Sequence, residues 1–441
     1  MDKVSYVGNA DVNAIDHLYK MYLQDPESVD IGWKKFFEGF EFARTNFEDG
    51  EIPENFQKEF RVINLIDGYR SRGHLFTRTN PVRERRKYSP TLAIENFGLS
   101  EADLDIVFQA GEEVGLGPTT LRNIIQHLED TYCESIGLEF MYIREPDHIA
   151  WFKNSIEIKN RPTFDTSTKK EVYRKLAITT GFESFLGKKF VGQKRFSIEG
   201  LEVLVPAIDA MVQRGAERGV EQFVFGMAHR GRLNTLTNIF EKRPRDIFSE
   251  FEGKEFEHDT RFDGDVKYHQ GFTSFIKAEN GNDLVMTLSP NPSHLEAVNP
   301  VVEGIARAKA DHLLNNDLKK VCPVLIHGDA AIAGQGVVYE TVQMAQLDAY
   351  KTGGTIHIVT NNQVGFTTNY LDGRSSTYCT DVAKTTLSPV FHVNGDDVEA
   401  VVQVMQMAME YRQHFNSDIF IDLLGYRKYG HNEGDEPKFT Q

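Results

Sequence analysis

The sequence has few cysteines and no long apolar run. Cys133, Cys322 and Cys379 are the only 3 cysteines among 441 residues, and their wide spacing matches no metal-thiolate motif. We therefore expect buried, reduced thiols. Since no apolar stretch is long enough to span a bilayer, no membrane partner is expected. The first residues resemble neither a signal peptide nor a transit peptide, which predicts a cytoplasmic protein, or a mature protein of the mitochondrial matrix in a eukaryote.

An excess of positive charge is also lacking. Lys and Arg number 49 against 65 Asp and Glu, which gives a formal net charge of −16 at pH 7, and the acids are spread along the chain. Nucleic acid is therefore not expected as a partner, because its phosphates would meet a negative protein. Residues 70–90 form the one distinctly basic segment, which is better explained as a solvated loop than as an anion site. The glycine motifs of P-loop and Rossmann nucleotide sites are missing too.

The patterns that are present divide the chain into three regions. Residues 1–45 carry two apolar stripes at helical spacing, interrupted at Asp25 and Pro26, and predict a helical arm. The arm is too short to bury its own stripes and should dock, either on the body of the protein or on a partner protein. Residues 46–188 are mainly helical in pattern. In residues 189–441 short apolar strands alternate with helices, which predicts an α/β domain with a parallel sheet covered on both faces.

Polar residues follow five of the expected strands. Ligands of such sheets bind beyond the carboxyl ends of the strands, so these residues should converge on one edge. The six expected strands lie within residues 222–229, 283–290, 322–329, 354–362, 388–397 and 418–427. The polar clusters are residues 229–232, 291–294, 328–330, 361–363 and 396–397.

Two of these clusters contain the oxygen ligands that magnesium prefers. Asp329 offers a carboxylate and Asn361-Asn362 a side-chain amide, and phosphate oxygens and water would fill the remaining positions. Gly334 and Gly336 should open a helix over residues 337–347, whose N-terminus favours a diphosphate. Taken singly, Asp329 is more simply a helix cap and the asparagines a turn. Together they predict a magnesium diphosphate site.

A family resemblance rests on these residues and on six further segments. Gly328-Asp329-Ala330, then thirty residues, then Asn361-Asn362 resembles the thiamine diphosphate motif of the transketolase superfamily. With the other segments, the chain resembles the thiamine-dependent decarboxylating subunits of 2-oxoglutarate dehydrogenase complexes. These segments are "LYKMYLQDPESVDIGWKKFFEGF" at 18–40, "GMAHRGRLN" at 226–234, "VKYHQGF" at 266–272, "NPSHLEAVNPVVEG" at 291–304, "NNQVGFTT" at 361–368 and "RKYGHNEGDEP" at 427–437.

The resemblance implies roles for named residues. Asp329, the side chain of Asn362 and the carbonyl of Val364 would bind Mg2+, and His229 and His269 would face the 2-oxo acid as catalytic residues. The further contacts to thiamine diphosphate would come from Arg230, Ser293, Leu295 and Ala330. Ala330 stands where the wider superfamily has glycine.

Physical chemistry agrees with these roles but allows simpler ones. A 2-oxo diacid needs cationic or donor side chains near its carboxylates and keto oxygen, which histidines and an arginine provide. Alternatively, His229 is a core histidine and His269 sits on a mobile loop. Ser293 with Glu296 also fits a helix capping box, which is compatible with a cofactor contact. His294 and His327 are expected beside the ligands or in the core, and His431 has no assigned role.

The function that the resemblance implies is oxidative decarboxylation of 2-oxoglutarate in the citric acid cycle. The succinyl group would pass to the lipoyl group of dihydrolipoamide succinyltransferase, with lipoamide dehydrogenase as a further partner and a homodimer as the assembly. One alternative is 2-oxoadipate as substrate, because one methylene changes binding by only about 1–3 kcal/mol. The others are a non-catalytic docking module and a transketolase-like carboligase. Family enzymes are longer and carry a glutamate that activates the cofactor in the missing half, so no turnover is expected from this chain alone.

Overall fold

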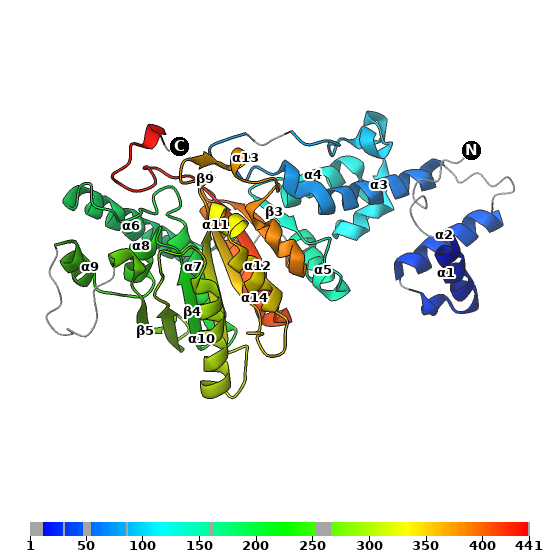
Figure 1. Ribbon diagram of the computed structural model, residues 1–441. Coiled ribbons are helices and arrows are strands. Elements are labelled where there is room, and N and C mark those ends of the chain that lie inside the picture. Colours follow the sequence, from blue (N-terminus) through cyan, green and yellow to red (C-terminus); the bar gives the residue numbers. More distant parts are fainter. Residues whose placement is uncertain are drawn as a thin grey trace.

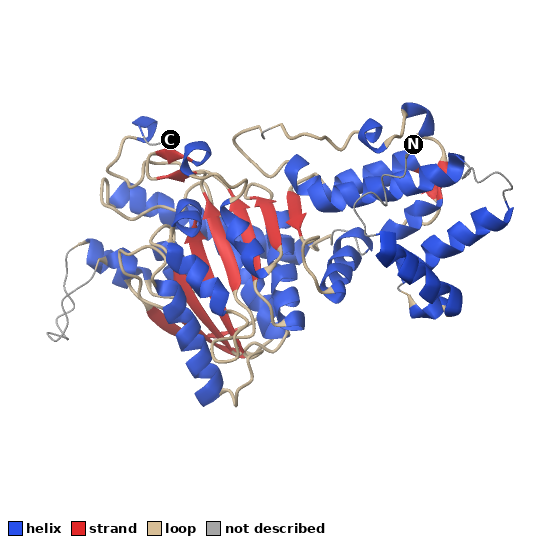
Figure 2. Cartoon of the chain, turned by 45° about the vertical axis from the view of Figure 1, so that its right-hand side comes forward, coloured by secondary structure: helices blue, strands red, loops and turns tan. Residues whose placement is uncertain are grey.

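The computed structural model describes residues 12–29, 31–46, 54–84, 87–158, 163–252 and 266–439. An N-terminal pair of helices lies at one end, a helical region follows, and a large α/β domain makes up the rest (Figures 1 and 2). None of the described helices combines the length and the apolar character needed to cross a bilayer. Residues 1–11 of the predicted arm and residues 47–53 after it lie outside the described residues.

The arm consists of the two helices that the sequence predicts. α1 (Val12–Gln24) and α2 (Ile31–Asn46) are joined by a 3-10 turn, η1 (Pro26–Ser28), which Asp25 caps by accepting a hydrogen bond from the backbone N–H of Glu27. Phe37 is buried between the helices together with Tyr22 and Val29. The expectation that the stripes cannot bury themselves is therefore only partly correct, because each helix covers much of the other's apolar face.

The helical region contains fewer loops than its sequence predicts. α3 continues through residues 70–72, and the buried guanidinium of Arg70 pairs with Glu157, with 2.8 Å between Nε and Oε1. The interpretation of residues 70–90 as a solvated loop is thus wrong for its first residues. The helices here are α3 (Glu54–Arg72), α4 (Leu121–Tyr132), α5 (Pro146–Lys153) and α6 (Thr166–Lys189), with a π-helical turn η6 (Asn154–Ile158) and a small hairpin of β1 (Val107–Phe108) and β2 (Thr119–Thr120).

An eight-stranded sheet forms the centre of the α/β domain, in the order β3-β11-β12-β8-β7-β4-β6-β5. The six strands that the sequence predicts are present and run parallel to one another. They are β4 (Gln222–Met227), β6 (Asp283–Leu288), β7 (Val321–Gly328), β8 (Ile356–Asn361), β11 (Val390–Asn394) and β12 (Ile419–Leu424). The antiparallel edge strands, β3 (Ile136–Glu139) and β5 (Phe272–Lys277), were not predicted. Since β3 belongs to the helical region, a boundary at residue 188 does not separate that region from the sheet.

Helices cover both faces of the sheet, as the apolar strands predict (Figure 1). Successive side chains of β4 point to opposite faces, so Phe223 and Phe225 join the large core under α7 and α14 whereas Val224 packs with α10. The covering helices are α7 (Leu204–Glu217), α8 (Arg232–Asn238), α9 (Pro244–Phe251), α10 (Val298–Leu313), α11 (Asp329–Gly334), α12 (Gly336–Met344) and α14 (Val398–Phe415). A hairpin of β9 (Val364–Gly365) and β10 (Thr368–Asn369) leads into the short helix α13 (Tyr370–Gly373) and the 3-10 helix η8 (Cys379–Thr386).

Candidate functional site

The strand order reverses between β4 and β7. The chain passes from β4 to β6 on one side and then to β7 on the other, and such a reversal opens a crevice at the carboxyl ends of the two strands. Residues after β4, β6, β7 and β8 lie at this edge. Asp397, after β11, has a different task, because its side chain accepts a hydrogen bond from Ala400 N–H at 3.1 Å and caps α14. The fifth polar cluster is therefore explained by a helix cap.

Asp329 and Asn362 each present a buried acceptor oxygen. Asp329 is 3 % exposed, and its Oδ2 has no hydrogen-bond partner among the described residues. Burial raises the pKa of Asp329 to about 7, although Arg374 opposes the shift from 3.7 Å away. Oδ1 of Asn362 is likewise buried without a hydrogen-bond partner in the described part of the chain. Orphaned buried oxygens are destabilising unless a cation or donor reaches them, so this pair fits the oxygen ligands of Mg2+.

The neighbouring asparagine has a structural task. Nδ2 of Asn361 donates to Asp422 Oδ1 at 2.8 Å, and Oδ1 of Asn361 accepts from Gln363 N–H at 3.0 Å. Gln363 adopts the left-handed backbone region, with φ 64. The turn therefore holds Asn361 inward and leaves Asn362 for a ligand. Val364 follows in β9, where its carbonyl is the third proposed ligand.

The helix expected after Gly334 is two helices. α11 begins at Asp329 itself and ends at Gly334, and α12 begins at Gly336. The prediction is therefore correct for Gly336 and wrong for Gly334, which ends a helix. The N-cap residue of α11 is Gly328, which has no side chain to cap the helix, and the carboxylate of Asp329 in the first turn is favourable there. Ala330 follows it and packs against the hairpin: a Cβ placed on Gly365 would lie 2.7 Å from that of Ala330.

His229 and His269 lie on either side of Tyr268. The ring centroids are 6.4 Å from Tyr268 to His229 and 5.2 Å from Tyr268 to His269. Burial, with a further contribution from Arg230, lowers the pKa of His229 to about 3, so this imidazole is neutral at neutral pH. His269 is buried in the 3-10 turn η7 (Lys267–His269), and its backbone N–H donates to Val266. The two predicted catalytic histidines are thus brought together at the site.

Arg230 supplies a buried cation. Its Nη1 donates to the carbonyl of Ser197 at 3.1 Å and its Nη2 to that of His431 at 2.7 Å. Burial and the nearby Arg427 lower the pKa of Arg230 to about 10, which leaves it charged at neutral pH, and Asp329 acts in the opposite direction. This electrostatic interaction between Arg230, after β4, and Asp329, after β7, agrees with the prediction that residues after these strands converge on one edge.

The loop between β6 and α10 differs from its prediction. Ser293 and Leu295 lie on it, and both are exposed. The capping box of Ser293 with Glu296 is wrong: α10 begins at Val298 after Ala297, and Glu296 turns inward with φ 67. Oε2 of Glu296 is 2.6 Å from Nδ1 of His327, a fully buried core residue. His294, expected near the ligands or in the core, is exposed.

Two functional candidates, Arg374 and Arg427, escaped the sequence analysis, and a third, His431, was named there without a role. Arg374 approaches Asp329 from the segment after α13 and belongs to none of the quoted motifs. Arg427 is buried and donates through Nη2 to Phe366 at 2.9 Å. His431 lies beside the rings of Phe366 and Phe196, with centroids at 4.9 and 5.6 Å. The motif at residues 427–437 contained both Arg427 and His431 and was the only available signal.

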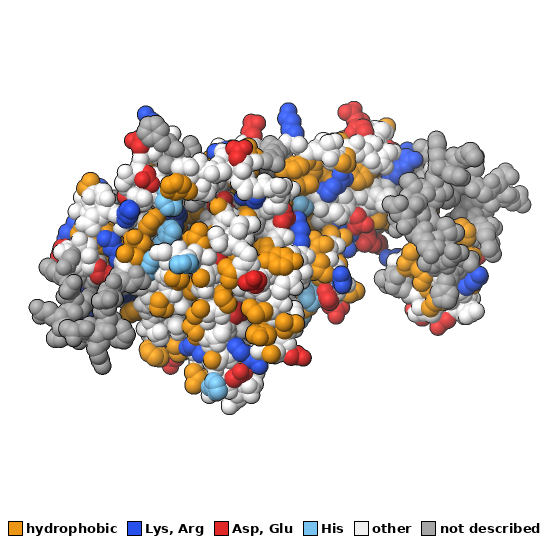
Figure 3. Space-filling view, in the orientation of Figure 1, with side chains coloured by type: hydrophobic (Ala, Val, Ile, Leu, Met, Phe, Trp, Pro, Cys, Tyr) orange, Lys and Arg blue, Asp and Glu red, His pale blue; other side chains and the backbone are white. Residues whose placement is uncertain are grey.

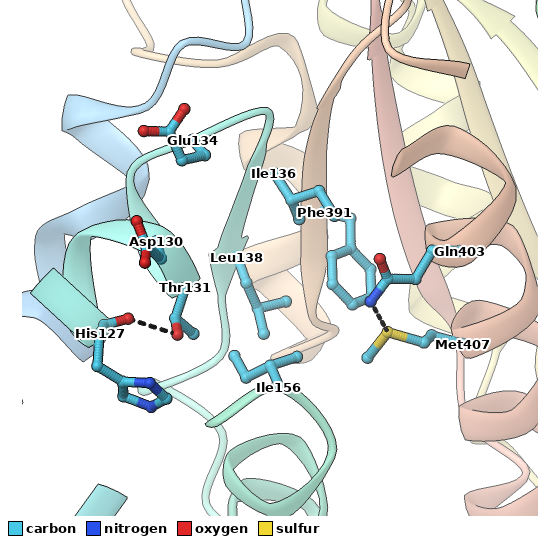
Figure 4. A pocket seen from close by; sticks show the side chains of 10 residues that line it. All are labelled: His127, Asp130, Thr131, Glu134, Ile136, Leu138, Ile156, Phe391, Gln403 and Met407. Carbon is cyan, nitrogen blue, oxygen red and sulfur yellow. Dashed lines mark hydrogen bonds between the residues drawn. The ribbon is translucent and has the colours of Figure 1, made fainter. Parts of the chain in front are cut away.

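A cavity lies away from the strand ends. It has a volume of about 250 Å³ between α4, β3, β11 and α14 (Figure 4). The apolar side chains of Leu138 and Phe391 lie in the middle of that view, between His127 and Thr131 of α4 on one side and Gln403 of α14 on the other. None of the residues that the sequence singled out as ligands or catalysts lines this cavity. The candidate site is therefore the edge of the sheet at β4, β7 and β8.

The fold and this edge define an α/β protein with two buried, unbonded acceptor oxygens near a buried arginine. Comparisons with known proteins specify the family. A family model described as "Dehydrogenase E1 component" matches residues 174–441, and one described as "2-oxoglutarate dehydrogenase N-terminus" matches residues 5–44. The chain belongs to the dehydrogenase E1 component family. The resemblance found in the sequence motifs is confirmed.

Curated relatives agree with this assignment. A 2-oxoglutarate dehydrogenase E1 component of Azotobacter vinelandii is 45 % identical over 97 % of this chain and 48 % of its own length. The mitochondrial 2-oxoglutarate dehydrogenase of Dictyostelium discoideum is 40 % identical over 99 % of this chain and 46 % of its own. A multifunctional 2-oxoglutarate metabolism enzyme of Mycolicibacterium vanbaalenii is 48 % identical over 87 % of this chain and 31 % of its own length. The chain thus spans at most about half the length of these relatives.

Proposed function

We propose that this chain binds Mg2+ and the diphosphate of thiamine diphosphate at the carboxyl ends of β4, β7 and β8. The observation that carries the proposal is the pair of buried, unbonded acceptor oxygens on Asp329 and Asn362. A divalent cation would satisfy both oxygens, and the carbonyl of Val364 would complete the protein's share of the ligands. Membership of the dehydrogenase E1 component family supports thiamine diphosphate as the anion.

The residues around this site suit a 2-oxo acid. When bound, thiamine diphosphate supplies a nucleophilic carbon for the keto group and takes up the electrons released by loss of carbon dioxide. Arg230 stays cationic at neutral pH and attracts a carboxylate or a phosphate. His229 is neutral, so its ring can donate a hydrogen bond to the keto oxygen without adding charge to the site. His269 would complete the wall that faces the substrate.

The reaction proposed for the complete protein is oxidative decarboxylation of 2-oxoglutarate. The succinyl group would be transferred to the lipoyl group of dihydrolipoamide succinyltransferase, in a complex that also contains lipoamide dehydrogenase. This proposal is supported by the names of the relatives, which cover this chain almost entirely. The glutamate that activates the cofactor would belong to the part of those relatives that this chain does not span. Steady release of carbon dioxide from 2-oxoglutarate by this chain alone would contradict that division of labour.

Two other functions use the same fold. 2-Oxoadipate is one methylene longer than 2-oxoglutarate, and comparing carbon dioxide release from the two acids by a full-length relative would separate them. A docking function is favoured by the arm, on which Leu23 and Phe40 remain exposed beside its own small core. If Mg2+ and thiamine diphosphate fail to bind while the arm captures the acyltransferase or lipoamide dehydrogenase, the docking function is correct.

A second copy of the chain is the partner proposed for the α10–α12 face. Hydrophobic side chains gather on this face (Figure 3), and the side chains of Tyr339, Leu347 and Tyr350 are about half exposed there. A cleft of about 540 Å³ lies between the two helices. Apolar patches of this kind mark interaction surfaces. Sedimentation of the wild-type chain and of Leu347→Asp tests the dimer: a monomeric wild type would contradict it.

Asp329→Ala tests the central proposal. Removing the carboxylate should abolish magnesium-dependent binding of thiamine diphosphate in calorimetry, with little loss of folded signal, because Asp329 lies at a strand end rather than in the apolar core. Asp397→Ala is the matched control, since it removes another strand-end acid that has a structural task. Unchanged affinity in Asp329→Ala would overturn the assignment.

A further inference from the structure

We propose that the helical region positions the metal-binding Asn362 by holding the residues on either side of it, Asn361 and Gln363. The inference rests on the proposed function and assigns positioning residues to the same site. Asn80 and Glu139, both from the helical region, are the anchors of two separate hydrogen-bonded connections. Neither residue touches the proposed ligands, and each acts through a chain of side chains.

The first connection joins Asn80 to Gln363. Nδ2 of Asn80 donates to Oε1 of Gln363 at 2.7 Å, and Nε2 of Gln363 donates back to Oδ1 of Asn80 at 3.0 Å. The same Nε2 also donates to the carbonyl of Gly425 at 2.9 Å. This reciprocal pair fixes the side chain of a residue whose backbone is already in the left-handed region. The residue directly after Asn362 is therefore tied to the loop that follows α3.

The second connection runs from Asn361 to Glu139 through two more buried residues. Asn361 donates to Oδ1 of Asp422 at 2.8 Å, and Oδ2 of Asp422 is 2.8 Å from Nδ1 of His392. Nε2 of His392 is 2.9 Å from Oε1 of Glu139 on the edge strand β3. The four side chains are each at most 5 % exposed. The residue directly before Asn362 is therefore tied to β3.

The charge pattern makes the second connection rigid. Both ring nitrogens of His392 face carboxylates, and both can donate to them only when the ring is an imidazolium. Hydrogen bonds to Asp422 and Glu139 outweigh burial and raise the pKa of His392. Tyr378 stacks on the imidazole with centroids 3.8 Å apart. Lys384 adds a bond of 2.7 Å to Glu139, so opposite charges alternate from Asp422 to Lys384.

Strand geometry separates this chain of groups from the cavity in Figure 4. Phe391 pairs with Leu138 across β11 and β3, and both side chains line the cavity. Glu139 and His392 are their next neighbours along the strands and so point to the opposite face. On that face Gly137 lacks a side chain. A Cβ placed on Gly137 would lie 3.2 Å from the Cα of His74. The helical region thus closes directly over the imidazolium.

Two pairs of variants of the full chain test the inference. Asn80→Asp keeps the acceptor that bonds the N–H groups of Val82 and Arg83 but loses the donor to Gln363. Its control is Asn96→Asp, which also removes an amide donor in the helical region, there to Thr91. Glu139→Gln removes the anchor of the second connection. Its control is Glu157→Gln, which weakens a similarly buried ion pair with Arg70 that shares no residue with either connection.

The measurement is the dissociation constant of Mg2+, by calorimetry at saturating thiamine diphosphate, together with the melting temperature of each variant. Asn80→Asp and Glu139→Gln should weaken Mg2+ binding by about tenfold, the effect typical of residues that orient metal ligands. The Mg2+ dissociation constants of the controls should stay within about twofold of the wild-type value, while their melting temperatures fall by amounts similar to those of the test variants. A merely structural role would move the melting temperature and leave the Mg2+ affinity of test and control variants equal.

Each outcome decides a different question. If test and control variants have the same affinity, the positioning role is overturned and the proposed cofactor site stands. If the wild type itself does not bind Mg2+ and thiamine diphosphate, the proposed function fails, and the positioning role fails with it. Should Glu139→Gln not fold, Asn80→Asp decides alone, because Asn80 lies at a partly exposed position.

Discussion

Glu303 is a partly buried carboxyl group on α10 that titrates near neutral pH. Burial raises its pKa to about 7, with a further contribution from Asp418. The hydroxyls of Thr352 and Thr355 each donate to one of its oxygens at 2.8 Å. Because the folded protein holds this proton more tightly than the unfolded chain, the stabilisation is complete below the unfolded pKa. It is lost as the pH rises towards and through about 7.

Glu303→Gln should remove that pH dependence. A shift from 4.5 to about 7 corresponds to roughly 3 kcal/mol of unfolding free energy between the two ends of the range. Denaturant unfolding should therefore show that the free energy of unfolding declines less from pH 5 to pH 8 in the variant than in the wild type. Glu340→Gln, at an exposed position of α12, is the control and should keep the wild-type decline. An equal decline in all three proteins would contradict the prediction.

The sequence identified the site residues that lie in local patterns and missed those that reach it from a distance. Asp329 and Asn362 follow apolar strands, so their place at the sheet edge could be predicted. Arg374 could not, because nothing near it in sequence indicates that it turns towards Asp329. Ser293 and Glu296 show the opposite failure: their spacing is typical of a capping box, but the helix begins two residues after Glu296.

At the scale of elements, the contact between α11 and β9 sets the width of the proposed metal site. Asp329 begins α11, and Val364 begins β9. Ala330 and Gly365, the next residue of each element, touch closely enough that a Cβ on Gly365 would lie only 2.7 Å from the Ala330 Cβ. The glycine is therefore needed for close approach, and its φ is not in the left-handed region.

Gly365→Ala should push β9 away from α11 and weaken Mg2+ binding by about tenfold, or 1.4 kcal/mol. The double variant Ala330→Gly with Gly365→Ala should restore the affinity, because it returns the missing space to the other side of the contact. Calorimetry at saturating thiamine diphosphate measures both. A double variant as weak as Gly365→Ala would show that the contact does not set the distance between the ligands.

The N-cap of α14 gives a prediction about stability alone. Asp397→Ala removes the bond to the N–H of Ala400 and should lower the free energy of unfolding by about 1 kcal/mol. Cofactor affinity should not change, since this acid caps a helix of 18 residues and is not a ligand. Denaturant unfolding and calorimetry check the two statements. A loss of Mg2+ affinity would return Asp397 to the site.

The parallel strands were predicted and the edge strands were not. β4, β8 and β12 are buried throughout and β7 in all but its last residue, and continuous apolar runs with polar ends identify such strands. β3 has only four residues, one of them glycine, which gives too little pattern to recognise. β5 alternates between partly buried and exposed residues and turns into β6 at Asn280-Gly281, where Gly281 has φ 88. That dipeptide is typical of a β-hairpin, so the antiparallel pairing of β5 with β6 could have been predicted.

At the scale of the whole molecule, the arm is a separate folding element. Its buried residues form a cluster of their own, distinct from the large core. Among the described residues, the ring of Phe36 on α2 approaches that of Phe60 on α3, with centroids 6.1 Å apart. The arm therefore adds little to the stability of the body.

Deleting residues 1–46 should lower the melting temperature of the remaining chain by less than about 2 °C, because about 1 kcal/mol corresponds to roughly 1 °C in a protein of this size. Binding of Mg2+ and thiamine diphosphate should be retained, because the connections to Asn362 start at Asn80 and Glu139. Differential scanning calorimetry and titration measure the two effects. Loss of cofactor binding after this deletion would mean that the arm supports the site.

The edge strand β3 shows that the family match and the folded sheet have different limits in this protein. The region that matches the dehydrogenase E1 component family begins at residue 174, whereas the sheet begins at Ile136. A chain trimmed to the matched region would leave one side of β11 with unpaired N–H and carbonyl groups, which invite pairing with other molecules. A fragment designed from the family match alone would therefore lack a strand that the sheet needs.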